Sequence, residues 1–216
     1  MESISSRYQL VRESVPGSVR LVAITKGHEL DEIKSALSAG CLEIGENKIQ
    51  EAEEKNIISL KESHPNIVLH MVGHLQRNKV KMAVSIFDVI QSVDSIALAR
   101  KIANEAAAQK KCITIYLQFR VSGHESQDGF IGEEELESAA KEIRAMQNEY
   151  FKLEGLMGIA SVAHPRENFE ELKAMADRLK LPIISMGMSG DYRIAIEAGS
   201  TMVRIGTAIF GERDED

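Results

Sequence analysis

The sequence of 216 residues is poor in the features that mark several classes of protein. It contains only two cysteines, Cys41 and Cys112, which lie far apart and outside any Cys-x-x-Cys spacing. This excludes a disulfide scaffold and a cysteine zinc site, and it fits a reducing compartment. No apolar run reaches the roughly 20 residues of a membrane span, and residues 1–15 lack the apolar centre of a secretory signal. We therefore expect a cytoplasmic protein whose cysteines are small core residues.

Positive charge is also in short supply. The chain has 26 lysines and arginines against 33 aspartates and glutamates, which gives a net charge of −7. This balance argues against a general nucleic-acid binder. The six histidines form no His-x-x-x-His or His-x-Glu pattern, so we expect no metal site. The hydrophobic content of 44% and charged content of 27% are ordinary globular values, and the length fits one domain over residues 1–216.

From about residue 20 onward, two kinds of segment alternate. The first kind is short, apolar and rich in β-branched residues, as strands buried on both faces are. The second kind places apolar residues three and four positions apart, as in residues 136–146 and 169–179, which predicts helices with one apolar stripe. The eight segments of the first kind are residues 19–25, 41–44, 67–72, 87–91, 112–119, 153–159, 182–186 and 201–205.

Eight repeats of strand and helix predict an α/β fold. Each repeat takes about 24 residues, close to the minimum for a (β/α)8 TIM barrel. An open doubly wound sheet is the alternative, but that fold often carries a Gly-x-Gly-x-x-Gly turn, and none occurs here. We favour the barrel, with an extra N-terminal helix over residues 3–15. Gly40 and Gly199 stand where two helices should end, at the left-handed position after the last turn.

In a barrel, functional residues belong at the C-terminal ends of the strands. Lys26 follows the apolar run of residues 21–24 and should sit at the inner rim. An isolated cation is costly there, and the neutral amine is a nucleophile toward carbonyls. The alternative for a lone lysine is that it extends to solvent or pairs with a carboxylate.

The last two strands lead into loops that are suited to an anion. Ser189 and Thr207 can donate hydroxyl groups, while Gly190 and Gly206 leave backbone N–H groups uncovered. Barrels often bind phosphate at this place. The alternative is that Ser189 only caps a helix and the glycines only form turns.

Arg204 lies within the last apolar strand and always carries its charge. It needs an acceptor, which an aromatic ring nitrogen or a carboxylate such as Glu43 or Glu46 could provide. One ligand accounts for the lysine, the phosphate loops and the arginine together, namely pyridoxal 5′-phosphate (PLP) bound as an aldimine on Lys26. Because arginine only donates, it would disfavour protonation of the pyridine nitrogen and weaken the electron sink.

Six motifs support this interpretation. They are LVAITK at residues 21–26, IGENKIQE at 44–51, HMVGHLQRNK at 70–79, GLM at 155–157, SMGMS at 185–189 and VRIGTAIFG at 203–211. Over nearly its whole length the chain resembles the YggS/PROSC family of pyridoxal phosphate homeostasis proteins. The resemblance implies a barrel similar to the cofactor domain of alanine racemase, of PLP fold type III, with PLP on Lys26. It further implies Asn47 beside the ring, His74 and Arg77 at the rim, Ser189, Gly206 and Thr207 at the phosphate, and Arg204 at the ring nitrogen.

The resemblance also implies a role without turnover, namely buffering PLP and delivering it to apo-enzymes, by a monomer. A small amino-acid racemase is the alternative, and it needs acid/base groups on both faces of the substrate α-carbon. In alanine racemase the second-face tyrosine comes from a β-domain across a dimer, and a chain that stops at Asp216 leaves no room for one. A phosphosugar aldolase with Lys26 as Schiff base would give Arg204 no ring to meet. We therefore expect a PLP carrier.

Three positions depart from the family pattern. Gly27 stands where a threonine is usual, Lys48 replaces a common tyrosine, and Gln127 takes the place of a lysine in the stretch 125–129. The first departure should alter access to the aldimine and the second a contact at the rim. The third calls into question a role of that lysine in passing PLP on or in a secondary cofactor site.

Overall fold

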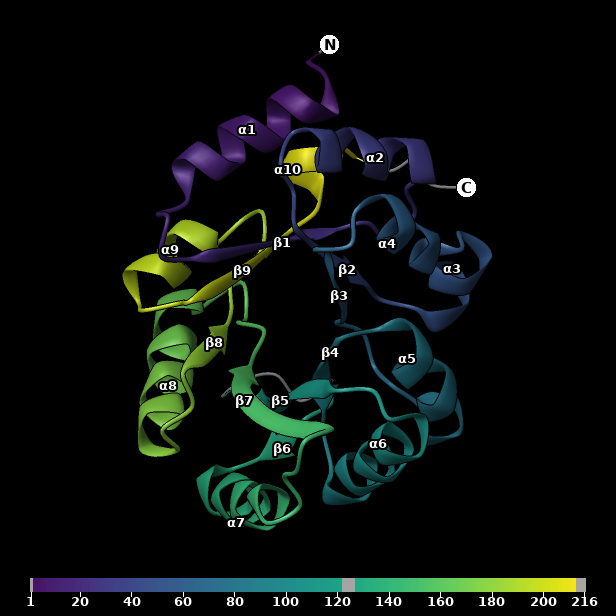
Figure 1. Ribbon diagram of the computed structural model, residues 1–216. Helices are drawn as coiled ribbons and strands as arrows, with labels where there is room; N and C mark the ends of the chain where they lie inside the picture. The colour runs from purple at the N-terminus through teal and green to yellow at the C-terminus, as the bar shows by residue number, and fades with distance from the viewer. Residues whose placement is uncertain (1, 122–126, 213–216) are drawn as a thin grey trace.

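A computed structural model describes residues 2–121 and 127–212. Within these residues, eight parallel strands form a closed ring, in which each strand pairs with the next and β9 returns to β1 (Figure 1). The ring confirms the predicted (β/α)8 barrel. The strands are β1 (Arg20–Ile24), β2 (Glu43–Glu46), β3 (Val68–Met71), β4 (Val89–Val93), β5 (Ile113–Arg120), β7 (Phe151–Met157), β8 (Ile183–Ser185) and β9 (Met202–Ile205).

Helices surround the ring on its outer side (Figure 1). Gly40 and Gly199 follow two of them with φ of 95° and 98°, the left-handed conformation that their positions predict. The helices are α1 (Ile4–Ser14), α2 (Leu30–Ser38), α3 (Ile49–Glu54), α4 (Leu60–Ser63), α5 (Val80–Ile86), α6 (Ile96–Gln109), α7 (Glu133–Arg144), α8 (Pro165–Arg178), α9 (Tyr192–Glu197) and α10 (Thr207–Phe210), with 3-10 turns η1 (Ile57–Ser59) and η2 (Arg77–Lys79).

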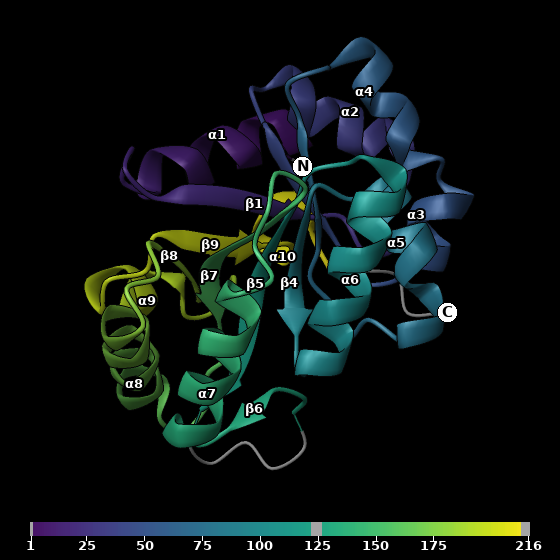
Figure 2. The ribbon, with the colours of Figure 1, turned by 60° about the horizontal axis from the view of Figure 1, so that its bottom comes forward.

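The extra N-terminal helix is present as α1 and is capped by the side chain of Ser3. It packs beside α10, the last helix of the barrel (Figure 1), and Figure 2 shows α1 from a second direction. Arg7 joins the two helices, because its Nε donates to the carbonyl of Ile209 at 2.7 Å and its Nη2 to the carbonyl of Phe210 at 2.8 Å. The first helix therefore holds the segment that directly follows β9.

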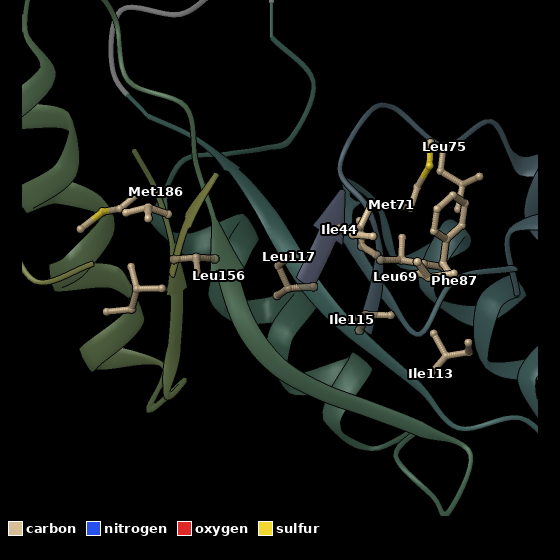
Figure 3. Packing of buried hydrophobic residues seen from close by; sticks show 14 of the residues in the cluster. Ile44, Leu69, Met71, Leu75, Phe87, Ile113, Ile115, Leu117, Leu156 and Met186 are labelled. Carbon is tan, nitrogen blue, oxygen red and sulfur yellow. The ribbon is translucent and has the colours of Figure 1, made fainter. Parts of the chain in front are cut away.

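The apolar core has two parts because strand side chains alternate between the faces of the ring. On β1, Leu21 and Ala23 belong to the large cluster outside the ring, whereas Val22 belongs to a smaller one that includes Tyr116 and Met202. Figure 3 shows part of the large cluster. Burial of both faces explains why the strands read as continuous apolar runs.

Two details differ from the expectations. A two-residue strand, β6 (Phe130–Ile131), pairs with the end of β5 and is too short to leave a pattern in the sequence. Cys41 is buried as expected, but the prediction that Cys112 is a core residue is wrong, since it is exposed just before β5 begins.

No helix in the described parts of the chain combines the length and apolarity that crossing a bilayer requires.

Candidate cofactor-binding site

A pocket of about 280 Å³ opens among the residues that follow β1, β2, β8 and β9. Its volume is near the lower end of the range for ligand pockets. It includes seven of the eight residues predicted from the sequence, although their roles remain predictions. These seven are Lys26, Asn47, Ser189, Gly190, Arg204, Gly206 and Thr207.

The eighth predicted residue, His74, lies outside this pocket. It lines a separate, wider one together with Arg77. Its Nδ1 lies 3.4 Å from a carboxylate oxygen of Asp94 and 3.1 Å from one of Asp128, and these contacts hold the ring there. One ring nitrogen of His74 and one carboxylate oxygen from each of Asp94 and Asp128 lie within 4.8 Å of one another, a grouping of atoms of the kind that bind metal ions. Spacing in the sequence does not reveal this grouping, because the residues follow three different strands.

Lys26 is partly buried at the end of β1. Its amine has no hydrogen-bond or ion-pair partner within residues 2–121 and 127–212. The alternative in which a carboxylate neutralises this lysine therefore has no support. An unpaired amine that lines a pocket is free to meet a ligand.

The backbone on both sides of Lys26 is fixed by polar contacts. Before it, Thr25 donates its hydroxyl to Glu46 Oε1 at 2.6 Å, and Lys55 Nζ donates to the Thr25 carbonyl at 2.8 Å. After it, the N–H of Gly27 donates to Glu51 Oε2 at 3.2 Å. These contacts hold the ends of the lysine residue while its amine stays free.

Glu46 is fully buried on β2 and is paired with Lys55, whose Nζ lies 3.0 Å from Oε1. Its other oxygen, Oε2, has no hydrogen-bond partner among the described residues. Burial raises the pKa of this carboxyl, while Thr25 and Lys55 act in the opposite direction. No pattern in the sequence reveals this pair, because Glu46 lies beyond the predicted second strand, residues 41–44.

Arg204 is buried on β9, with 5% of its surface exposed, and its guanidinium lines the pocket. Nη1 donates to the carbonyl and the hydroxyl of Ser185, both at 2.7 Å, and Nη2 donates to the Gly158 carbonyl at 3.0 Å. Burial lowers the pKa of Arg204 to about 10, which still leaves it charged at neutral pH.

The protein gives this buried cation only neutral acceptors. No carboxylate in the described chain bonds to Arg204, and no described residue accepts from its Nε. The alternative partners suggested by the sequence are occupied elsewhere, since Glu43 pairs with Arg20 and Glu46 with Lys55. A buried guanidinium that donates only to neutral groups beside a pocket fits a ligand that offers a further acceptor.

The loops after β8 and β9 meet at the pocket. The N–H of Ala208 donates to Ser189 Oγ at 3.4 Å, and Thr207 is exposed beside it. Helix α9 begins after Asp191, so Ser189 is not its N-cap, as the alternative interpretation required. At Gly190 a Cβ would meet nothing within 4 Å, which shows open space there.

The position of Asn47 depends on close contact between its backbone and Gly73, in the loop that follows β3. A Cβ on Gly73 would lie 2.1 Å from the Asn47 carbonyl oxygen, and backbone atoms cannot yield cheaply. We expect Gly73→Ala to displace Asn47 and to lower the free energy of unfolding by about 1–3 kcal/mol. Urea unfolding checks this against Gly17→Ala, where a Cβ meets nothing within 4 Å. Equal stability of the two variants would contradict the expectation.

The pocket also contains Ile24, His28, Met188 and Gly211, for which the sequence predicted no individual role. Among them, His28 is buried and stacks on Phe210, with ring centroids 4.8 Å apart and an angle of 27° between the planes. Its Nδ1 lies 3.4 Å from Glu32 Oε2. No sequence pattern could place this ring, since it depends on how α10 folds back over the β1 loop.

The three departures have different structural settings. Gly27 has φ of 74°, a conformation that favours glycine over threonine. Lys48 is exposed and lies 3.5 Å from Glu51. Gln127 is partly buried, but part of its motif, residues 125 and 126, lies outside the described residues.

Comparison with known proteins identifies the type of barrel. Residues 1–214 match the family model described as "Alanine racemase, N-terminal domain". An alanine racemase from Clostridium difficile 630 superposes with a TM-score of 0.78 at 16% identity, over 99% of this chain and 60% of its own. The barrel is therefore of the alanine racemase N-terminal type.

Closer relatives define the family. The "Pyridoxal phosphate homeostasis protein" of Synechocystis sp. is 37% identical to this chain, and the match covers 96% of this chain and 98% of that protein. The protein of the same name in Mus musculus is also 37% identical, and the match covers 90% of this chain and 77% of that protein. PipY of Synechococcus elongatus PCC7942, solved with PLP bound, is 32% identical with a TM-score of 0.86, over 97% of this chain and 100% of its own. The chain belongs to the family of pyridoxal phosphate homeostasis proteins.

Proposed function

We propose that this protein binds PLP in the 280 Å³ pocket and acts in PLP homeostasis, holding and releasing the cofactor without turnover of its own. The observation that carries the proposal is the combination of an unpaired lysine and a buried arginine without a carboxylate in one pocket. The names of the relatives and the PLP bound to PipY support the same role.

Each part of the pocket has a part of the cofactor to hold. The aldehyde of PLP supplies a carbon that condenses with an amine, with loss of one water, and Lys26 offers the amine. Arg204 would donate to the pyridine nitrogen, and Asn47 would lie beside the ring. The phosphate would be held by Ser189, Gly190, Gly206 and Thr207.

Racemase chemistry has less support. A racemase needs a proton donor or acceptor on each face of the substrate α-carbon. Apart from Lys26 and Arg204, the pocket lining holds His28 as its titratable side chain, and no tyrosine lines it among the described residues. The relatives are named for homeostasis, not for a reaction.

Our proposal also includes the partners of the protein, which are PLP and the apo-enzymes that need it. The proposed protein is a monomer that works in the cytoplasm.

Covalent trapping tests the function directly. The protein is incubated with PLP, reduced with borohydride, digested and analysed by mass spectrometry. We expect one pyridoxyl group, on the peptide that contains Lys26, because reduction fixes the imine that this lysine forms. A phosphosugar treated in the same way should leave no label, which separates a carrier from an aldolase.

Two results would overturn the proposal. One is a folded protein that remains unlabelled with excess PLP. The other is exchange of the α-proton of single amino-acid enantiomers for deuterium at rates above those of free PLP, since a carrier does not turn over substrate.

A further inference from the structure

Side chains of five strands form a continuous run of hydrogen bonds that leads away from the pocket. Arg204 Nη1 lies 2.7 Å from Ser185 Oγ, which lies 2.6 Å from Gln91 Oε1. Gln91 Nε2 lies 2.9 Å from His70 Nδ1, and His70 Nε2 lies 3.0 Å from Glu43 Oε2. The run joins β9, β8, β4, β3 and β2, so it crosses the interior of the ring.

Every hydrogen bond in this run points the same way. Arg204 can only donate, so the Ser185 hydroxyl accepts from it and donates its own proton to Gln91. The amide nitrogen of Gln91 also only donates, so His70 Nδ1 must accept. The ring proton of His70 is therefore on Nε2, from which it is donated to Glu43.

The charges at the two ends agree with this direction. Burial lowers the pKa of His70, which keeps its ring neutral. Burial alone would raise the pKa of Glu43, but hydrogen bonds from His70 and Arg20 hold it below its ordinary value. The run therefore begins at a guanidinium and ends at a carboxylate, and each bond polarises the next.

The run is also mechanically fixed. His70, Gln91 and Ser185 are completely buried. At the far end, Arg20 binds Glu43 through two hydrogen bonds of 2.8 Å, from Nε and Nη2. Each member thus has a partner on both sides, and none can rotate without leaving a buried polar atom unpaired, which is costly.

We propose that Ser185, Gln91 and His70 are positioning residues that orient Arg204 for its contact with the pyridine nitrogen, with the pair of Glu43 and Arg20 anchoring the far end of the run. A carboxylate next to Arg204 would occupy the donors that the ligand needs. Holding Arg204 through a polarised chain of neutral side chains fixes the guanidinium without a direct carboxylate and leaves it available at the pocket. The inference rests on the proposed function, since PLP gives this contact its purpose.

Two substitutions at Gln91 separate positioning from packing. Gln91→Leu removes the bonds to Ser185 and His70 and the weaker one from Nε2 to Met202 Sδ at 3.4 Å. Gln91→Glu keeps the acceptor for Ser185 and loses the donor. Tyr116→Phe is the matched control, because Tyr116 is a fully buried interior residue whose hydroxyl has, among the described residues, Arg20 as its one hydrogen-bond partner, at 3.5 Å. All three are made in the full chain.

The first measurement is the affinity for PLP, which is monitored through the absorbance of the bound cofactor. Gln91→Leu should weaken binding by about tenfold, as expected when a bond to a charged group loses its support, and should shift the absorption maximum. Tyr116→Phe should leave both values unchanged. The second reading is ¹⁵N NMR of the His70 ring without cofactor. The proton should be on Nε2 alone in the natural chain, and Nδ1 should gain a second proton in Gln91→Glu, because the ring then lies between two carboxylates that both accept.

The outcomes separate this inference from the proposed function. If the natural chain takes up no PLP, the function fails, and the NMR reading still tests the chain of bonds. If the natural chain binds PLP and Gln91→Leu binds it with the same affinity and spectrum, the positioning role is wrong while the function stands. Should Gln91→Leu not fold, Ser185→Ala breaks the same run with a smaller change, and the same two readings decide.

Discussion

Replacing Lys26 with methionine should abolish covalent uptake of PLP. Methionine keeps a long flexible side chain but offers no amine, and Lys26 is the one lysine among the described residues that line the pocket. After incubation with PLP and borohydride reduction, the natural chain should carry one pyridoxyl group, and Lys26→Met should carry none. Intact-protein mass spectrometry measures both.

The same variant should remain folded. The Lys26 amine has no partner in the described chain, so its loss should change the free energy of unfolding by no more than about 0.5 kcal/mol. Lys48→Met is the matched control, because Lys48 is a nearby exposed lysine outside the pocket and should label like the natural chain. A pyridoxyl group retained by folded Lys26→Met would show that another lysine carries the cofactor.

Replacing Lys55 with methionine should have the largest effect on stability. It leaves Glu46 as a fully buried carboxylate without its cation, and breaking a buried pair from one side costs about 3–5 kcal/mol. Adding Glu46→Gln should recover much of this loss, since the second change removes the stranded charge. Urea unfolding of the two single variants and the double variant measures the coupling between the residues.

The loss should depend on pH in a defined direction. Burial raises the pKa of Glu46 above its ordinary 4.5, and removing Lys55 removes an influence that lowers it. A carboxyl whose pKa is higher in the folded state stabilises the fold at low pH, and this contribution is lost as the pH rises through the folded-state value. The deficit of Lys55→Met should therefore be large at pH 7 and shrink as the pH falls toward 4.5. A deficit that stays constant or grows in acid would contradict this explanation.

The sequence predicts the barrel well because burial on both faces makes each strand an apolar run, and this signal does not depend on distant contacts. It fails where polar residues continue a strand. The second strand was expected at residues 41–44, but β2 covers Glu43–Glu46. Gly45 and Glu46 are typical of a loop, and only the pairing with Lys55 makes a buried glutamate acceptable here.

The site is predictable to the extent that parallel strands bring their ends together. This rule places Lys26 and Arg204 in one pocket although they lie 178 positions apart in the sequence. It does not place His28, whose position depends on the packing of α10, or His74, which carboxylates from other strands hold elsewhere. It also cannot reveal the run from Arg204 to Glu43, since that depends on side-chain orientation within the ring.

The contact between α1 and α10 has a consequence for biosynthesis. Arg7 emerges from the ribosome early, yet its acceptors, Ile209 and Phe210, lie 202 and 203 positions later. The ring itself closes only when β9 pairs with β1. A nascent chain that still lacks β9 and α10 therefore cannot complete the pocket, and until β9 is made the strands β1 and β8 have unpaired edges.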